Sequence, residues 1–277
     1  MKKYLFILLT IALFAVTVAC NDTAQEEGMS IEDILNNSVD AMENLTSYSI
    51  EMDTQQSMGI TEEESFDISS QLRMDLLLEP ITFYQLTTMD MGIMGGLLSY
   101  DSYYSEEHGF FMEDPFTEKW GKFPDTLLDN FINLTDEQIN PEEQLKTFLE
   151  YIDELTLTSD DNHYIISLKG EGMAMEALVD QIMGMSGETM NEVMDLMSDV
   201  EIHALDYEIF IDKETFYQVE AFVHLEMSME IIGDHVTTTQ SSHIIMSRFN
   251  ELNDLTIPED ILENAVELTE EDIFGGF

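Results

Sequence analysis

The chain has 277 residues, of which 44% are apolar, and 58 Asp and Glu face only 9 Lys and Arg, giving a net charge of −49. This charge excludes nucleic acid as a partner, because binding to phosphates needs clustered cations. It does not indicate disorder, since apolar and aromatic residues are plentiful and recur at regular periods. The acidic residues are spread along the chain, which is typical of a solvated surface suited to salty or alkaline surroundings. Cation capture is the alternative interpretation.

The first twenty residues predict export. Two lysines precede an apolar run at residues 4–18 that is too short to span a bilayer comfortably. Residues 16–20 (VTVAC) resemble a bacterial lipobox, with Thr17 in place of the usual leucine, and the resemblance implies diacylation of Cys20. Cys20 is the only cysteine, so it cannot form an intramolecular disulfide. Ordinary secretion with cleavage nearby is the alternative.

Lipid on Cys20 would hold the protein, through palmitate or another acyl chain, on the extracytoplasmic face of the cell membrane. An acidic domain is repelled by anionic headgroups, so the acyl chains must supply the attachment. The predicted divisions are a signal peptide at residues 1–19, a lipidated flexible tether at 20–29, one domain at 30–268 and an acidic tail at 269–277.

The domain alternates helical and strand patterns. Helices are predicted from Ser30, with Asp33 completing a capping box, from Pro141, and from Pro258. The last should turn Ile261, Leu262, Ala265 and Val266 inward. Alternating apolar and polar residues predict strands at 48–52, 66–76, 81–91, 97–104, 110–112, 155–158, 164–168, 201–211, 216–232 and 235–249.

Residues 173–197 differ from the rest of the chain because they are rich in methionine, and they predict helices broken near Gly184 and Gly187. The fold class is therefore α+β. Each strand offers one apolar side, so the economical arrangement is a curved antiparallel sheet with all its helices on one face.

The order of elements resembles that of the LolA-like and LppX-like lipoprotein-fold proteins, and especially uncharacterised lipoproteins of Gram-positive bacteria with that predicted fold. The resemblance covers nearly all of the mature chain. It implies a half-barrel-like sheet whose concave face is covered by helices, with a cavity for acyl chains in the characterised members. It is carried by Cys20, by SVDAMENLTSYSIEMD at 38–53, by WGKFP at 120–124, by IDKET at 211–215 and by IPEDILENA at 257–265.

No catalytic, metal or cofactor site is predicted, and we expect the protein not to be an enzyme. The sequence around Ser186 lacks the spacing of a nucleophile elbow. The six histidines show neither an H-E-x-x-H motif nor paired Cys/His spacing, and His224 lies on the polar register of its strand. Met-x-Met pairs such as Met227 and Met229 leave Cu(I) binding through thioethers as an alternative.

The methionines favour a hydrophobic ligand instead, because flexible thioether side chains make an adaptable apolar lining. The same positions are equally consistent with ordinary core packing. The predicted ligand-binding residues are Met183, Met190, Met194, Met197, Val219, Val223, Leu225 and Met227.

We therefore expect a membrane-anchored extracytoplasmic lipoprotein that binds or carries a lipid or other hydrophobic ligand between sheet and helices. The alternative is a non-enzymatic cell-envelope sensor or interaction protein with a solidly packed core and an envelope protein as its partner.

Overall fold

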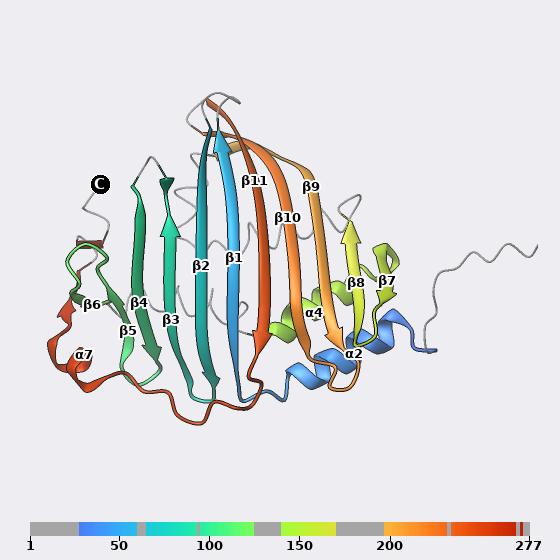
Figure 1. Cartoon of the computed structure of the whole chain (residues 1–277), viewed down its shortest axis with the longest axis horizontal. Coiled ribbons are helices and arrows are strands. Elements are labelled where there is room, and N and C mark those ends of the chain that lie inside the picture. The colour runs from blue at the N-terminus through green and yellow to red at the C-terminus, as the bar shows by residue number, and fades with distance from the viewer. Residues whose placement is uncertain are drawn as a thin grey trace, which may run out of the picture.

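The computed structural model of the chain describes residues 28–59, 65–92, 95–124, 140–169, 197–231, 234–269 and 272–273. Within them, 12 strands form one open sheet in the order β12-β6-β5-β4-β3-β2-β1-β11-β10-β9-β8-β7 (Figure 1). The strands are β1 (Ser47–Gly59), β2 (Ser65–Leu78), β3 (Ile81–Asp90), β4 (Leu97–Ser105), β5 (Gly109–Glu113), β6 (Trp120–Lys122), β7 (Leu155–Ser159), β8 (His163–Lys169), β9 (Met197–Asp212), β10 (Gln218–Ile231), β11 (Asp234–Ser247) and β12 (Val266–Glu267).

The described helices are α2 (Ile31–Met42), α4 (Pro141–Glu150), the short 3₁₀ helix η2 (Ile152–Glu154) and α7 (Glu259–Asn264). At the start of α2 the Asp33 backbone N–H donates to Ser30 Oγ at 3.1 Å, and the Asp33 side chain accepts from the Ser30 backbone N–H, which confirms the predicted capping box. Pro141 is the first residue of α4, as predicted. Neither these helices nor any other in the described part of the chain is long and apolar enough to cross a membrane.

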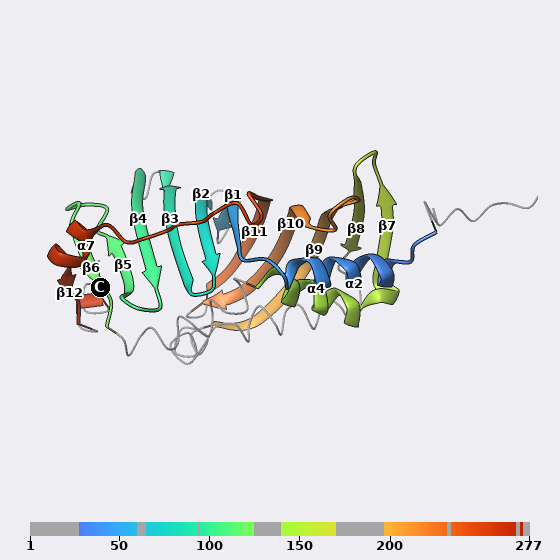
Figure 2. The same cartoon turned by 90° about the horizontal axis from the view of Figure 1, so that it is seen from below.

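Helices α2 and α4 pack side by side on one face of the sheet, behind its β7–β10 end (Figures 1 and 2). Their apolar faces meet β8 and β9, where the Phe148 and Tyr207 rings lie 5.1 Å apart. Burial under α4 raises the pKa of Tyr207 to about 12. The main core contains Ile34, Leu35, Met42, Tyr48, Leu76, Leu145, Ile166, Ile209, Ile211 and Ala221.

The prediction that all helices lie on one face is wrong for α7. Its Ile261 packs with Phe111 in a small separate cluster, and the partly buried Tyr103 packs against that cluster. Tyr103 and Phe111 are cross-strand partners that point away from the main core, whereas their neighbour Tyr104 points into it. Helix α7 therefore covers the other side of the sheet, at the end formed by β4, β5 and β6.

The inward direction predicted for the closing helix is also partly wrong. Ile261 is 5% exposed, but Leu262 is 36% and Val266 is 58% exposed. The chain leaves helical geometry at Ala265, and Val266 instead pairs with Gly121 as the parallel strand β12 at the sheet edge. This parallel pair is the exception in a sheet predicted, and otherwise found, to be antiparallel.

The strand predictions are confirmed in place but not always in length. Strand β1 continues beyond the predicted end at Met52 as far as Gly59. Residues 54–57 are Thr, Gln, Gln and Ser, so both sides of the strand are polar and the alternation disappears while the hydrogen-bonded ladders to β2 and β11 continue. Strand β9 likewise begins four residues earlier than the predicted Glu201, at Met197, so the helical prediction for residues 173–197 is wrong at its last residue. The signal peptide, Cys20 and the methionine-rich residues 173–196 lie outside the described residues.

Candidate functional site

The two sides of the central strands have different chemistry. The helix-side face is the one that carries Ile209, Ala221 and Ile244, which are cross-strand partners in the main core or packed against it. The open face is the opposite side, which carries Phe222 and His243. Successive side chains of a strand point to opposite faces, so every position on β9, β10 and β11 belongs to one face or the other.

On β10 the helix-side face stays apolar beyond the core. Val223, Leu225, Met227 and Met229 follow Ala221 at alternate positions. Leu205 on β9 is the cross-strand partner of Leu225, and Val236 on β11 is the partner of Met229. We call these six residues (Leu205, Val223, Leu225, Met227, Met229 and Val236) the apolar strip.

The strip residues do not belong to the main core cluster that the described residues form. Leu205, Leu225, Met229 and Val236 are 3%, 8%, 6% and 8% exposed, yet none belongs to the main core cluster. Figure 1 shows α2 and α4 behind the lower halves of β9 and β10, while the strip continues into the upper halves. The described helices therefore do not account for the apolar character of this part of the face.

A polar belt borders the strip on β11 and β1. Thr54 and Ser242 are cross-strand partners whose hydroxyls are hydrogen-bonded at 3.0 Å. The Gln240 side chain donates to Ser242 Oγ at 3.3 Å and lies opposite Gln56. Thr238, the next helix-side residue on β11, is 1% exposed, and its Oγ1 has no hydrogen-bond partner among the described residues.

Three predicted ligand-binding residues, Val223, Leu225 and Met227, are brought together in the strip. Val219 lies at a register shift between β9 and β10, so alternation does not fix its face. Met197 begins β9 but its side chain is not described, and the predicted residues Met183, Met190 and Met194 lie outside the described residues. The sequence analysis missed Leu205, Met229 and Val236. Met229 continues the alternation used for Met227, whereas the other two required the strand pairing.

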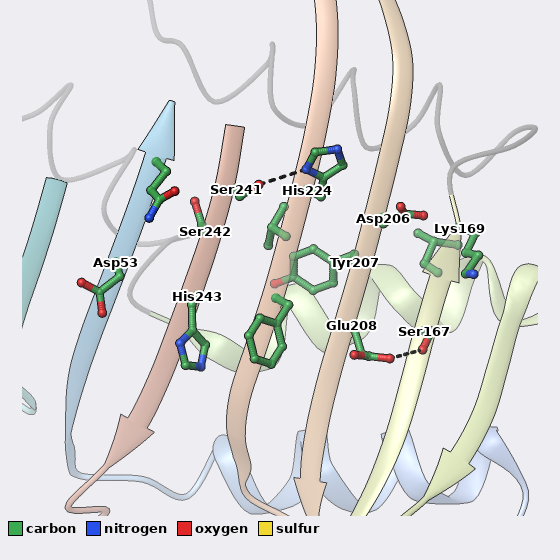
Figure 3. A pocket seen from close by; sticks show the side chains of 14 residues that line it. Asp53, Ser167, Lys169, Asp206, Tyr207, Glu208, His224, Ser241, Ser242 and His243 are labelled. Atoms are coloured by element: carbon green, nitrogen blue, oxygen red, sulfur yellow. Dashed lines mark hydrogen bonds between the residues drawn. The ribbon is translucent and has the colours of Figure 1, made fainter. Parts of the chain in front are cut away.

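The open face carries a polar groove that the sequence analysis also missed. Two cavities of about 600 Å³ and 530 Å³ share Gln55 and Ser241 in their linings, so they are neighbours on this face, and we call the two together the open-face groove. Figure 3 shows part of it, with Asp53, His224 and His243 on the side of the sheet away from α2 and α4. No single strand signals this groove, because it is assembled from neighbouring strands.

Short polar contacts organise this open-face groove. His243 Nε2 and Glu220 Oε1 are 2.6 Å apart, and His224 Nδ1 and Ser241 Oγ are 3.0 Å apart. His224 therefore lies on the polar side of β10, as predicted. Among the residues that the structure describes, no group of three or more His, Cys, Asp or Glu is arranged to hold a metal ion.

Several solved structures align with most of this chain, all at low identity. They include a putative outer membrane lipoprotein-sorting protein domain from Vibrio parahaemolyticus (10% identity, 82% of this chain and 94% of that chain, TM-score 0.27). A second is a β-barrel-like protein of domain of unknown function DUF1849 from Brucella abortus (8% identity, 75% of this chain and 100% of that chain, TM-score 0.22). A third is a LolA superfamily protein from Nitrosomonas europaea (9% identity, 84% of this chain and 97% of that chain, TM-score 0.19). TM-scores this low do not establish a shared fold, so the resemblance to LolA-like proteins remains a prediction.

No curated protein matches the sequence. The model of a family of unknown function, DUF6612, matches residues 30–266. This match covers most of the chain, and the protein therefore belongs to the DUF6612 family.

Proposed function

We propose that this protein is a lipid-anchored, extracytoplasmic binding or carrier protein whose apolar strip holds a lipid or other hydrophobic ligand. The observation that carries the proposal is the strip itself, a buried apolar surface that continues past the described helices and is not part of the core cluster of the described residues. Apolar association needs no charged partner, so the net charge of −49 does not oppose it.

The chemistry of the strip suits an acyl chain. Methionines and branched aliphatic side chains offer a flexible, nonpolar surface, and each CH₂ group removed from water contributes about 0.8 kcal/mol. The polar belt at Thr54, Ser242 and Gln240 gives the strip a defined border on one side. A ligand would then lie along β10 and not spread across the whole face.

Thr238 adds a polar feature to this site. Its cross-strand partners are Met58 on β1 and Met227 on β10, so a methionine flanks it on each neighbouring strand of the same face. A buried hydroxyl without a partner is costly, and an ester or hydroxyl group of the ligand would satisfy it. The proposed ligand class is therefore an acyl lipid with an oxygen function near its chain, such as an acylglycerol.

Lipid analysis of the full chain, purified in mild detergent from bacterial envelopes, tests the proposal. We expect a stoichiometric acyl lipid on the wild type by native mass spectrometry, and its loss in Leu225→Asn. The matched control is Ile245→Asn, on the open face, which should keep the lipid because that side chain is already 39% exposed. A lipid-free wild type that crosslinks to one envelope protein would instead support the alternative, a sensor or interaction protein.

The anchor requires a separate test. Labelled palmitate fed to the producing cells should enter the wild type and be absent from Cys20→Ala. An unlabelled wild type with an intact leader would contradict the anchor without affecting the strip.

A further inference from the structure

We propose that the open-face groove is a second binding site, for a neutral polyhydroxylated chain of the glycan type. The site lies on the opposite side of the sheet from the apolar strip and does not depend on the lipid proposal. Three features support it: the length of the groove, its aromatic centre and the balance of its polar groups.

The groove is long enough for an oligomer. Its lining runs from Lys169 on β8, across β9, β10, β11, β1 and β2, to Asp90 on β3. Adjacent strands lie ~4.8 Å apart, so the six intervals between these strands span about 29 Å. The groove crosses the strands on their face, and the central strands are paired on both sides. A peptide adding itself as a strand would need an open sheet edge instead.

An aromatic row leads into the middle of the groove. His163, Phe210, Phe222 and His243 come from four adjacent strands, with successive ring centroids 6.1, 5.8 and 4.3 Å apart. The last pair is parallel, at 4° between planes. Phe222 remains 39% exposed, although a ring of this size is normally buried. It offers an apolar surface on which the C–H groups of a sugar ring can pack.

Uncharged hydrogen-bonding groups outnumber carboxylates in the lining, even though the chain as a whole is strongly acidic. Hydroxyl and amide groups both donate and accept, as sugar hydroxyls do. The nearby carboxylates are already partly engaged: Gln71 donates to Asp53 Oδ1 at 2.7 Å, and Ser167 donates to Glu208 Oε1 at 2.9 Å. The uncharged side chains of the lining that lie on the open face include Gln55, Ser57, Ser69, Thr239 and Ser241.

Charge narrows the ligand class further. An anionic polymer is disfavoured, because the lining holds five carboxylates (Asp53, Asp67, Asp90, Asp206 and Glu208) and only one ammonium group, that of Lys169. A cationic polymer would be attracted to acidic surface over the whole protein and would have no reason to select this groove. A neutral chain is therefore the ligand class that the lining of this groove favours over anionic and cationic polymers.

Titration of the full chain with three hexasaccharides tests the proposal. Cellohexaose and the hexamer of N-acetylglucosamine are neutral, while the fully deacetylated glucosamine hexamer has the backbone of the second with ammonium groups added. We expect a neutral hexamer to bind with an affinity that changes little between low and physiological salt. Phe222→Ser should weaken that binding about tenfold, the upper range for an aromatic contact.

The control variant is Ile245→Ser. Ile245 is on the same face of the neighbouring strand, has the same 39% exposure as Phe222, and does not line the groove. It should leave the affinity unchanged. Binding only of the deacetylated hexamer with loss in salt, equal weakening by both variants, or no binding of either neutral hexamer at millimolar concentration would each overturn the proposal. Leu225→Asn should remove lipid without altering saccharide affinity, so failure of one proposal is distinguishable from failure of the other.

Discussion

Strand β10 contributes to two different surfaces, because its successive side chains point to opposite faces of the sheet. Ala221 and Leu225 are 0% and 8% exposed on the helix-side face, whereas Phe222 between them is 39% exposed on the open face. On β9, the cross-strand partners of Ala221 and Leu225 are the apolar residues Ile209 and Leu205, whereas those of Phe222 are Glu208 on β9 and His243 on β11. Period-two alternation thus lets one strand serve a nonpolar and a polar surface at the same time. Substitutions at adjacent positions can separate the two.

The largest expected difference between the faces is in stability. Ile209→Ala should lower the free energy of unfolding by about 2–5 kcal/mol, because Ile209 is 0% exposed and its loss leaves a cavity under the helices. Ile245→Ala on the open face should cost less than about 1 kcal/mol. Urea unfolding monitored by circular dichroism measures both. Equal losses would contradict the assignment of the core to the helix side.

A smaller effect, of opposite sign, is expected at the buried hydroxyl of the strip. Thr238→Val keeps the shape but removes a hydroxyl that has no partner in the described structure, and should stabilise the delipidated protein by about 1 kcal/mol. It should also weaken lipid binding. Ser38→Ala, at the other buried hydroxyl without a described partner, is the control and should leave lipid binding unchanged. Destabilisation by Thr238→Val would mean that the hydroxyl is already satisfied.

The stability of the protein at alkaline pH tests how closely α4 covers Tyr207 on the helix-side face of the sheet. Burial raises the pKa of Tyr207 to about 12, above the ordinary value near 10. A group whose folded-state pKa is raised contributes stability below pH 10, and this contribution is lost as pH rises from 10 through 12. Tyr207→Phe should therefore flatten the stability profile in that window. An unchanged slope would show that α4 does not desolvate the phenol.

The weakest expected effect is on stability at acidic pH, and it comes from Asp160 in the exposed turn between β7 and β8. Hydrogen bonds from the His163 side chain and from the backbone N–H groups of Asn162 and His163 lower the pKa of Asp160 to about 2. Its stabilisation is present above pH 4 and is lost as pH falls through 2. Asp160→Ala should make the midpoint of thermal unfolding fall less steeply between pH 4 and 2 than it does in the wild type. Equal slopes in the two proteins would contradict this contribution of Asp160.

Much of this fold follows from local patterns. The capping box at Ser30 and the long alternation after Ala221 each predicted their element, and both are confirmed. The upper half of β1 and the short strands β6 and β12 were missed. In β1, polar residues on both sides erase the alternation. Strand β6 has only three residues, and β12 is formed by a parallel pair at Val266 that joins residues distant in sequence.

The candidate sites were less predictable. Val223, Leu225 and Met227 were predicted because one strand displays their period. Leu205 and Val236 join them only through strand register, which no local pattern specifies. The open-face groove depends on six neighbouring pairings at once, and its residues look individually like ordinary solvated positions.

The most direct measurement of the central claim is photo-crosslinking of a diazirine-labelled fatty acid to the full chain, with the labelled residues mapped by mass spectrometry. The account predicts labels at alternate positions of β10, on Leu225, Met227 and Met229, that disappear in Leu225→Asn. Labels on Phe222 and His224, or labelling of β10 that is not competed by unlabelled lipid, would contradict a hydrophobic ligand on the helix-side face.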